Sequence, residues 1–391
     1  MTGPLLEYAG GWVKRHTWQH ALPLRFLLVA VDADDEEQLW ASCTAAEGLF
    51  VEPPSPPREV LTVRGCKPDG AFKEALAAAE ASYQGLGDVG VDVWDGDQPV
   101  QWWTLKDVAV LAQLPDSGDS GLYDLVIGAG VVPDADSCRP PKAPGFELFA
   151  PGQTVGGSRC SAIDGLFRSR PDPAAVPLEL IGCEPTELLL GRADTSGWGR
   201  LLVLDRDGAV MAAVALGLDI AEVRPSVIGA AFVDITLTDG GDERPLPAVR
   251  PIWDRWYESP PAEPNLWAPY DSQGRSAWIE LSTHAWRTPP PGPDLSGGEY
   301  HLDGRFVTDH PGLHCAMAEA LLGPGSYFGR ERNAFSDCLC GGFGVVPPFT
   351  LNWHDSDVAR QAFAGGRGER LTYFEEVVRL LERYGVTVVL R

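Results

Sequence analysis

The chain has 391 residues, of which 44% are hydrophobic, and a formal net charge of −24 at pH 7. This length exceeds what a single hydrophobic core usually supports, so we expect several globular domains. The acidic balance argues against direct nucleic-acid binding, because phosphate contacts need clustered Lys and Arg. No run of 18 apolar residues and no signal peptide is recognisable, so we expect no membrane span and a cytoplasmic location.

Residues 1–22 form a polar N-terminal extension, and an internal repeat follows it. Residues 42–68 align without a gap to residues 159–185, and chance rarely matches so many Cys, Gly and Pro in one register. We therefore predict two β-rich tandem repeats, residues 23–132 and 140–243. The matched pairs include Cys43 and Cys160, Gly48 and Gly165, Gly65 and Gly182, Cys66 and Cys183, and, after a shift in register, Asp124 and Asp234.

Within both copies, short apolar stretches alternate with turn-forming residues, which is typical of strands. Residues 201–216 predict a β-hairpin with a polar turn, residues 232–237 a further strand, and residues 71–83 a helix.

No pattern in the repeats indicates catalysis or metal binding. Aspartates recur at two predicted turns. Asp is a common turn former, and no further oxygen ligands for Ca²⁺ follow these residues in the sequence. The eight cysteines include no Cys-x-x-Cys pair, and the two that recur 23 residues apart predict a packed core pair of free thiols. We expect no enzyme activity, no metal and no cofactor. The recurring acids are Asp95, Asp97, Asp205 and Asp207.

Residues 244–297 are rich in Pro and Trp and form a predicted linker. Because disordered linkers rarely contain so many Trp, we expect an extended segment lying on a domain surface, with a strand over residues 277–281. The Pro-Pro-Pro-Gly-Pro run at residues 289–293 predicts a stiff spacer and a domain boundary.

Residues 298–391 alternate strand and helix signals. A capping box at Thr372-x-x-Glu375 begins one helix, and Gly341-Gly342 ends another. The order of elements predicts a three-stranded parallel sheet packed by helices, so the chain is expected to be an α+β multidomain protein. The predicted strands are residues 300–302, 349–353 and 386–390, and the predicted helices are residues 311–322, 331–340, 355–363 and 372–384.

Three short motifs give the C-terminal module a family resemblance. They are Tyr327-Phe328-Gly329 followed by Asp337-Cys338-Leu339, Leu351-Asn352-Trp353, and the terminal helix, glycine and Val-rich strand. Together they resemble the barstar family of ribonuclease inhibitors. The resemblance implies a barstar-like α/β domain whose second helix and preceding loop plug a nuclease active site. Asp337 would take the place of the substrate phosphate, and Tyr327 and Gly329 match the loop residues that cover the catalytic histidine.

The residues themselves leave each of these roles open. A carboxylate on a helix can accept charge-assisted hydrogen bonds from guanidinium groups. The alternative is that Asp337 is a solvated surface acid. Tyr327 is otherwise a core or edge aromatic, and Gly329 a turn residue with positive φ.

Four positions depart from the family pattern. Asn333 stands where the family has a second acid, and Ser336 stands where a family member presents a large aromatic. Arg330 and Arg332 add positive charge beside the plug, which would repel a basic active site.

Two hypotheses follow from these patterns. In the first, the chain is an immunity or antitoxin-type protein that binds a ribonuclease or related nuclease toxin through Tyr327, Gly329, Asn333, Ser336 and Asp337. In the second, the barstar-like module is a docking or structural domain, and the acidic repeats bind another partner.

Overall fold

The computed structural model describes residues 16–32, 34, 36–82, 85–115, 121–133, 139–150, 157–170, 175–191, 197–238, 244–286, 293–364 and 371–391. These form two compact units. The smaller unit contains the described residues of Pro54–Ala174 and Gly365–Thr372, and the larger unit contains those of Met1–Pro53, Ala175–Ala364 and Tyr373–Arg391. Most of the predicted N-terminal extension lies outside the described residues.

The smaller unit is an antiparallel sheet whose strands run in the order β8-β7-β4-β5-β6-β3-β9. The two edge strands are separated in the chain by Ser161 alone, so the row of strands closes on itself around a core that includes Leu61, Val91 and Trp103. Its elements are β3 (Arg58–Cys66), α1 (Gly70–Ser82), β4 (Gly87–Asp95), β5 (Gln98–Pro115), β6 (Tyr123–Pro133), β7 (Pro144–Phe149), β8 (Ser158–Cys160) and β9 (Ala162–Asp164).

The larger unit contains a second antiparallel sheet, in the order β12-β11-β1-β2-β10-β14-β13. Its edge strands, β12 and β13, are separated in the chain by Leu218 and Asp219 alone, so the two ends of this row meet as well. The elements are β1 (Phe26–Val31), β2 (Glu37–Glu47), β10 (Leu178–Pro185), α2 (Glu187–Leu190), β11 (Trp198–Leu204), β12 (Val210–Gly217), β13 (Ile220–Pro225) and β14 (Val233–Leu237).

Aligned residues of the two stretches have matching geometry. Gly65 and Gly182 both have positive φ, 54° and 61°. The Gly65 amide donates to Asp124 at 2.9 Å, and the Gly182 amide donates to Asp234 at 3.0 Å. In both stretches, therefore, a glycine with positive φ lies at an irregularity of its strand and donates its amide to a buried or half-buried aspartate.

The cysteines are buried free thiols, except for Cys340, which is exposed, and Cys138, which lies outside the described residues. The predicted partners within each copy are wrong. Cys43 on β2 is opposite Cys183 on β10, and Cys160 is the neighbour of Cys66, so each thiol packs against one from the other aligned stretch. The reason is that β2 hydrogen-bonds to β10 and not to β3. As a result, the compact units do not follow the domain boundaries predicted for the two repeats.

The Pro- and Trp-rich segment is helical, which corrects both the predicted extended segment and the predicted strand at residues 277–281. It forms a short 3-10 helix η1 (Pro247–Val249), α3 (Arg250–Glu258) and α4 (Ser272–Trp286). A proline near the start of α3 removes no helical hydrogen bond, because the first amide groups of a helix have no partner within it. Trp253 and Trp256 are spaced by three residues, so both face the core. Residues 289–292 of the predicted spacer lie outside the described residues.

The C-terminal part of the larger unit is the predicted three-stranded parallel sheet packed by helices, in the order β15-β16-β17. Leu302, Leu351 and Trp353 are fully buried in its core. The elements are β15 (Glu299–Asp303), a 3-10 helix η2 (Gly304–Phe306), α5 (His310–Leu322), α6 (Arg332–Leu339), β16 (Thr350–His354), α7 (Ser356–Ala362), α8 (Tyr373–Arg383) and β17 (Thr387–Leu390).

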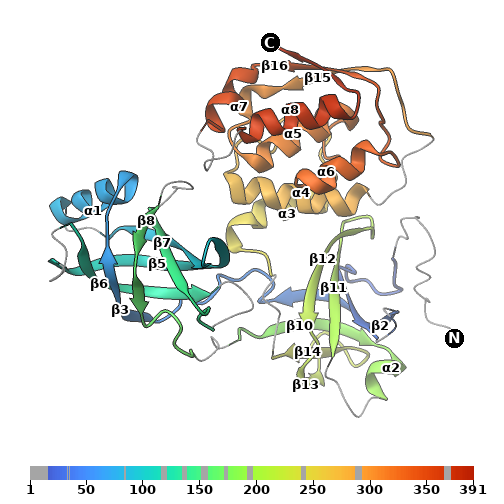
Figure 1. Ribbon diagram of the computed structural model, residues 1–391. Helices are drawn as coiled ribbons and strands as arrows, with labels where there is room; N and C mark the ends of the chain where they lie inside the picture. The colour runs from blue at the N-terminus through green and yellow to red at the C-terminus, as the bar shows by residue number, and fades with distance from the viewer. Residues whose placement is uncertain are drawn as a thin grey trace. The chain divides into compact units, whose positions relative to one another are not determined.

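Helices α3 and α4 share the core of this C-terminal part, and α4 lies beside α5 (Figure 1). Arg275 of α4 is buried and donates to Asp309 at 2.9 Å and to Thr308 at 2.8 Å. Asn265, in the connection between α3 and α4, donates to Asp303 at 2.9 Å. Charged and amide groups thus fix the orientation of helices that apolar burial holds in place.

Candidate partner-binding site

Helix α6 follows a glycine-rich loop that ends α5. Gly323 has a φ of 94°, a conformation that favours glycine and ends the helix. The Glu331 carboxylate then caps α6 by accepting from the amides of Asn333 and Ala334 at 3.1 and 3.0 Å. These two hydrogen bonds hold the pKa of Glu331 below its ordinary value. A local cap therefore sets where α6 begins.

The exposed face of α6 presents Asn333 and Asp337, one helical turn apart. The opposite face packs inward through Phe335, Cys338 and Leu339. Within the described part of the chain, the Asp337 carboxylate accepts no hydrogen bond and forms no ion pair. A solvated carboxylate is therefore available at the surface to a positively charged group from outside.

Ser336 is half-buried and lies on the side of α6 that faces α8. Its hydroxyl is 2.6 Å from the hydroxyl of Tyr384. The small side chain thus makes an internal contact between the two helices.

Each of the two arginines beside α6 is paired with an acid. Arg330 is 3.2 Å from Glu280 of α4, and Arg332 is 3.3 Å from Glu376 of α8. Both pairs are largely exposed, so each contributes little to stability. They nevertheless place a negative charge next to each positive one, which reduces the repulsion expected towards a basic partner.

The loop before α6 is turned inward. Tyr327 is 9% exposed and Phe328 is fully buried. Burial raises the pKa of the Tyr327 hydroxyl. Gly329 has a φ of 83°, and a Cβ at this position would lie 2.4 Å from the Cα of Phe335, so only glycine fits.

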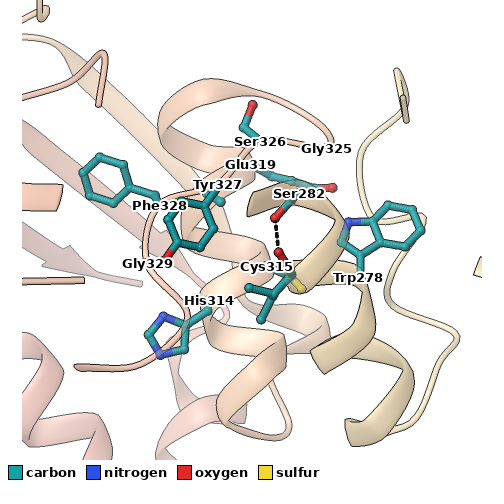
Figure 2. A pocket seen from close by; sticks show the side chains of 12 residues that line it. Trp278, Ser282, His314, Cys315, Glu319, Gly325, Ser326, Tyr327, Phe328 and Gly329 are labelled. Atoms are coloured by element: carbon teal, nitrogen blue, oxygen red, sulfur yellow. Dashed lines mark hydrogen bonds between the residues drawn. The ribbon is translucent and has the colours of Figure 1, made fainter. Parts of the chain in front are cut away.

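A narrow pocket separates this loop from α4. Figure 2 shows Trp278 and Ser282 of α4 on one side, and Tyr327 and Phe328 on the other. Helix α5 supplies His314, Cys315 and Glu319 to its lining, which is otherwise mostly apolar. The loop is thus packed against a helix that precedes the C-terminal sheet.

His314 connects three elements around the loop. Its Nε2 is 3.1 Å from the Tyr373 hydroxyl of α8, and its ring is hydrogen-bonded to the backbone of Gly329. Burial, and then the neighbouring His310, lower the pKa of His314 to about 4, against the opposing effects of Glu331 and the Gly329 hydrogen bond. A neutral imidazole therefore anchors the loop.

The family comparison now decides the identity of this region. The model of the family "Barstar (barnase inhibitor)" matches residues 299–391. The C-terminal domain is a barstar domain. No curated protein and no solved structure matches the chain.

Within the barstar domain, the residues proposed from sequence divide into two groups. Asn333 and Asp337 lie together on the exposed face of α6. Tyr327 and Gly329 lie in the interior, and the Ser336 hydroxyl is hydrogen-bonded to that of Tyr384, directly after α8.

Sequence reasoning missed His314 and Glu280, which contact the loop before α6, and Asp294, which contacts the turn after α6. His314 lies four residues after His310 in α5. Its position on an apolar helix face was the sequence feature that could have identified it. Glu280 and Asp294 precede the family region, and no local signal connects them to it.

The residues that the structure describes contain no group of three or more His, Cys, Asp or Glu side chains placed to hold a metal ion. They also contain no helix that is both long and apolar enough to cross a membrane.

Proposed function

We propose that the chain is an immunity or antitoxin-type inhibitor that blocks a ribonuclease or related nuclease with its barstar domain. The observation that carries this proposal is the exposed Asp337 carboxylate, at the position of the family's phosphate-mimicking acid. The plug acts by occupying the active site, without catalysis and without a cofactor.

The physical argument rests on charge. An active site that binds phosphate contains Arg, Lys and His, and a carboxylate that enters it exchanges water for charge-assisted hydrogen bonds. The pairing of Arg330 and Arg332 with acids supports this, because neither is left as an isolated positive charge beside Asp337. The free thiols suit a reducing compartment, so we place the protein in the cytoplasm.

The test mixes the full chain with barnase as a basic ribonuclease probe and measures RNA cleavage. We expect inhibition by the natural sequence. Removing one member of a buried charge pair costs about 2–5 kcal/mol, so Asp337→Ala should weaken inhibition by at least about 30-fold. Asp357→Ala is the matched control, because Asp357 is an exposed acid on α7 of the same domain. Equal inhibition by both variants would rule out the role of Asp337.

A second candidate function is a docking or structural domain. The burial of Tyr327 and Gly329 favours it, because two of the loop positions used by the family are occupied internally. Asn333 also replaces the second acid. A full chain that leaves barnase fully active at micromolar concentrations would favour this alternative.

We further propose that the two aligned stretches are copies that have exchanged their first two strands. The larger unit would then combine β1 and β2 of one copy with β10 to β14 of the other. The cross-pairing of the cysteines and the matching glycine–aspartate hydrogen bonds support this. The exchange gives the N-terminal part a structural role, and it predicts that residues 54–174 fold independently.

A further inference from the structure

The plug helix α6 is contacted at both ends by residues that precede the barstar-family region, which begins at residue 299. One contact region lies on α4 and the other at residues 294–297. Neither region belongs to α6 or to the loop before it, which bind a partner in the proposed function.

At the N-terminal end, α4 packs against the loop that leads into α6. Tyr327 and Phe328 of the loop line the same pocket as Trp278 of α4. The Glu280 carboxylate is 3.2 Å from Arg330, directly before the cap of α6. Further along the loop, a Cβ at Gly325 would lie 3.0 Å from the Pro261 ring, so the backbone approaches the upstream segment closely.

At the C-terminal end, one carboxylate holds the chain that leaves α6. The Gly342 amide donates to Asp294 at 2.6 Å, and the Gly344 amide donates to its other oxygen at 2.7 Å. Both glycines have positive φ, 85° and 90°, a conformation that other residues rarely adopt. Asp294 thus satisfies two backbone amides in a turn that would otherwise depend on water.

The adjacent backbone extends this contact. The Leu295 amide donates to the Gly344 carbonyl at 2.9 Å, and the Val346 amide donates to the Leu295 carbonyl at the same distance. Residues 294–297 therefore run alongside the chain after α6, ahead of the first strand of the barstar domain.

We propose that α4 and residues 294–297 form a built-in brace that fixes both ends of α6 before any partner binds. Glu280 and Asp294 are its positioning residues. A plug held in one conformation loses less conformational freedom on binding, so the brace preorganises the surface that carries Asp337. Asp294 contributes more than Glu280, because its two hydrogen bonds are short and charge-assisted while the exposed pair is screened by solvent.

The brace does not depend on what the plug binds, so its test uses no partner. Hydrogen exchange followed by mass spectrometry on the full chain compares the natural sequence with Asp294→Ala, Asp294→Asn and Glu280→Ala. Asp357→Ala again serves as the exposed-acid control. We expect Asp294→Ala to raise exchange at least tenfold in α6 and residues 340–346, while amides of β16 keep their rates. Asp294→Asn should give a smaller change in the same segments, because an amide oxygen is a weaker acceptor. Glu280→Ala should change only residues 327–332, by less than Asp294→Ala.

Two results would overturn the proposal. One is unchanged exchange in α6 and residues 340–346 of Asp294→Ala. The other is faster exchange spread evenly over the domain, including β16, which would show a general loss of stability. If Asp294→Ala does not fold, the same criteria apply to Asp294→Asn, which keeps the size of the side chain.

Discussion

Replacing Trp278 by Ala should destabilise the barstar domain, although Trp278 lies outside the family region. Its side chain is 2% exposed and meets Trp256 edge-to-face, with ring centres 5.5 Å apart. It belongs to the same cluster of buried side chains as Leu313 and Met317 of α5. Truncating a buried Trp to Ala leaves a cavity and costs about 3–5 kcal/mol, so we expect a loss in this range in the free energy of unfolding.

The measurement is the opening free energy of the slowest-exchanging β16 amides, because β16 is the central strand of the barstar sheet. Trp198→Ala is the control, since Trp198 is 54% exposed on β11 and should change this free energy by no more than about 0.5 kcal/mol. A loss below about 1 kcal/mol in Trp278→Ala would refute the conclusion that α4 belongs to the core of the domain.

Three further predictions concern other parts of the chain. Because burial lowers the pKa of His314 from 6.5 to about 4, the unfolded state takes up a proton first as the pH falls. The free energy of unfolding should therefore decrease between about pH 6.5 and pH 4, by up to about 3 kcal/mol, and His314→Gln should reduce this dependence in thermal unfolding scans. Gly329→Ala should lower the melting temperature by several degrees or prevent folding, because the added methyl group meets the Phe335 backbone at positive φ. The isolated fragment 54–174 should give a cooperative unfolding transition by circular dichroism, whereas fragment 23–132 should not, because it lacks the strands that close either sheet.

The barstar domain could be predicted from sequence because its signals are local. Helix α8 begins at Tyr373, directly after the Thr372 that opens the capping box, and β17 follows a glycine with positive φ, Gly385. Such signals depend on residues a few positions apart, so they survive without knowledge of the tertiary structure.

The pairing of the N-terminal strands could not be predicted in this way. Strand β2 has two similar candidate partners, β3 and β10, because residues 61–66 of β3 align with residues 178–183 of β10. Local propensity is the same for both, and only the packing of the complete sheet selects β10. The prediction for the Trp-rich segment was wrong for a different reason. Its prolines suggested an extended chain, whereas the three-residue spacing of Trp253 and Trp256 already indicated a helix.

Part of the geometry of the candidate site follows from the sequence. Asn333 and Asp337 lie on the exposed face of α6, as their spacing in a helix allows. The burial of Tyr327 depends on α4, a helix that the sequence did not suggest, so no motif within the family region reveals it.

The contact between α4 and α5 also determines where the chain can be divided for experiments. A fragment that begins at residue 298 would lack Trp278 and Arg275, and the apolar side of α5 would face water. Exposed apolar surfaces of this kind promote aggregation, so we expect such a fragment to be poorly soluble. A fragment for expression should begin before residue 247, ahead of the first helical turn that closes this surface.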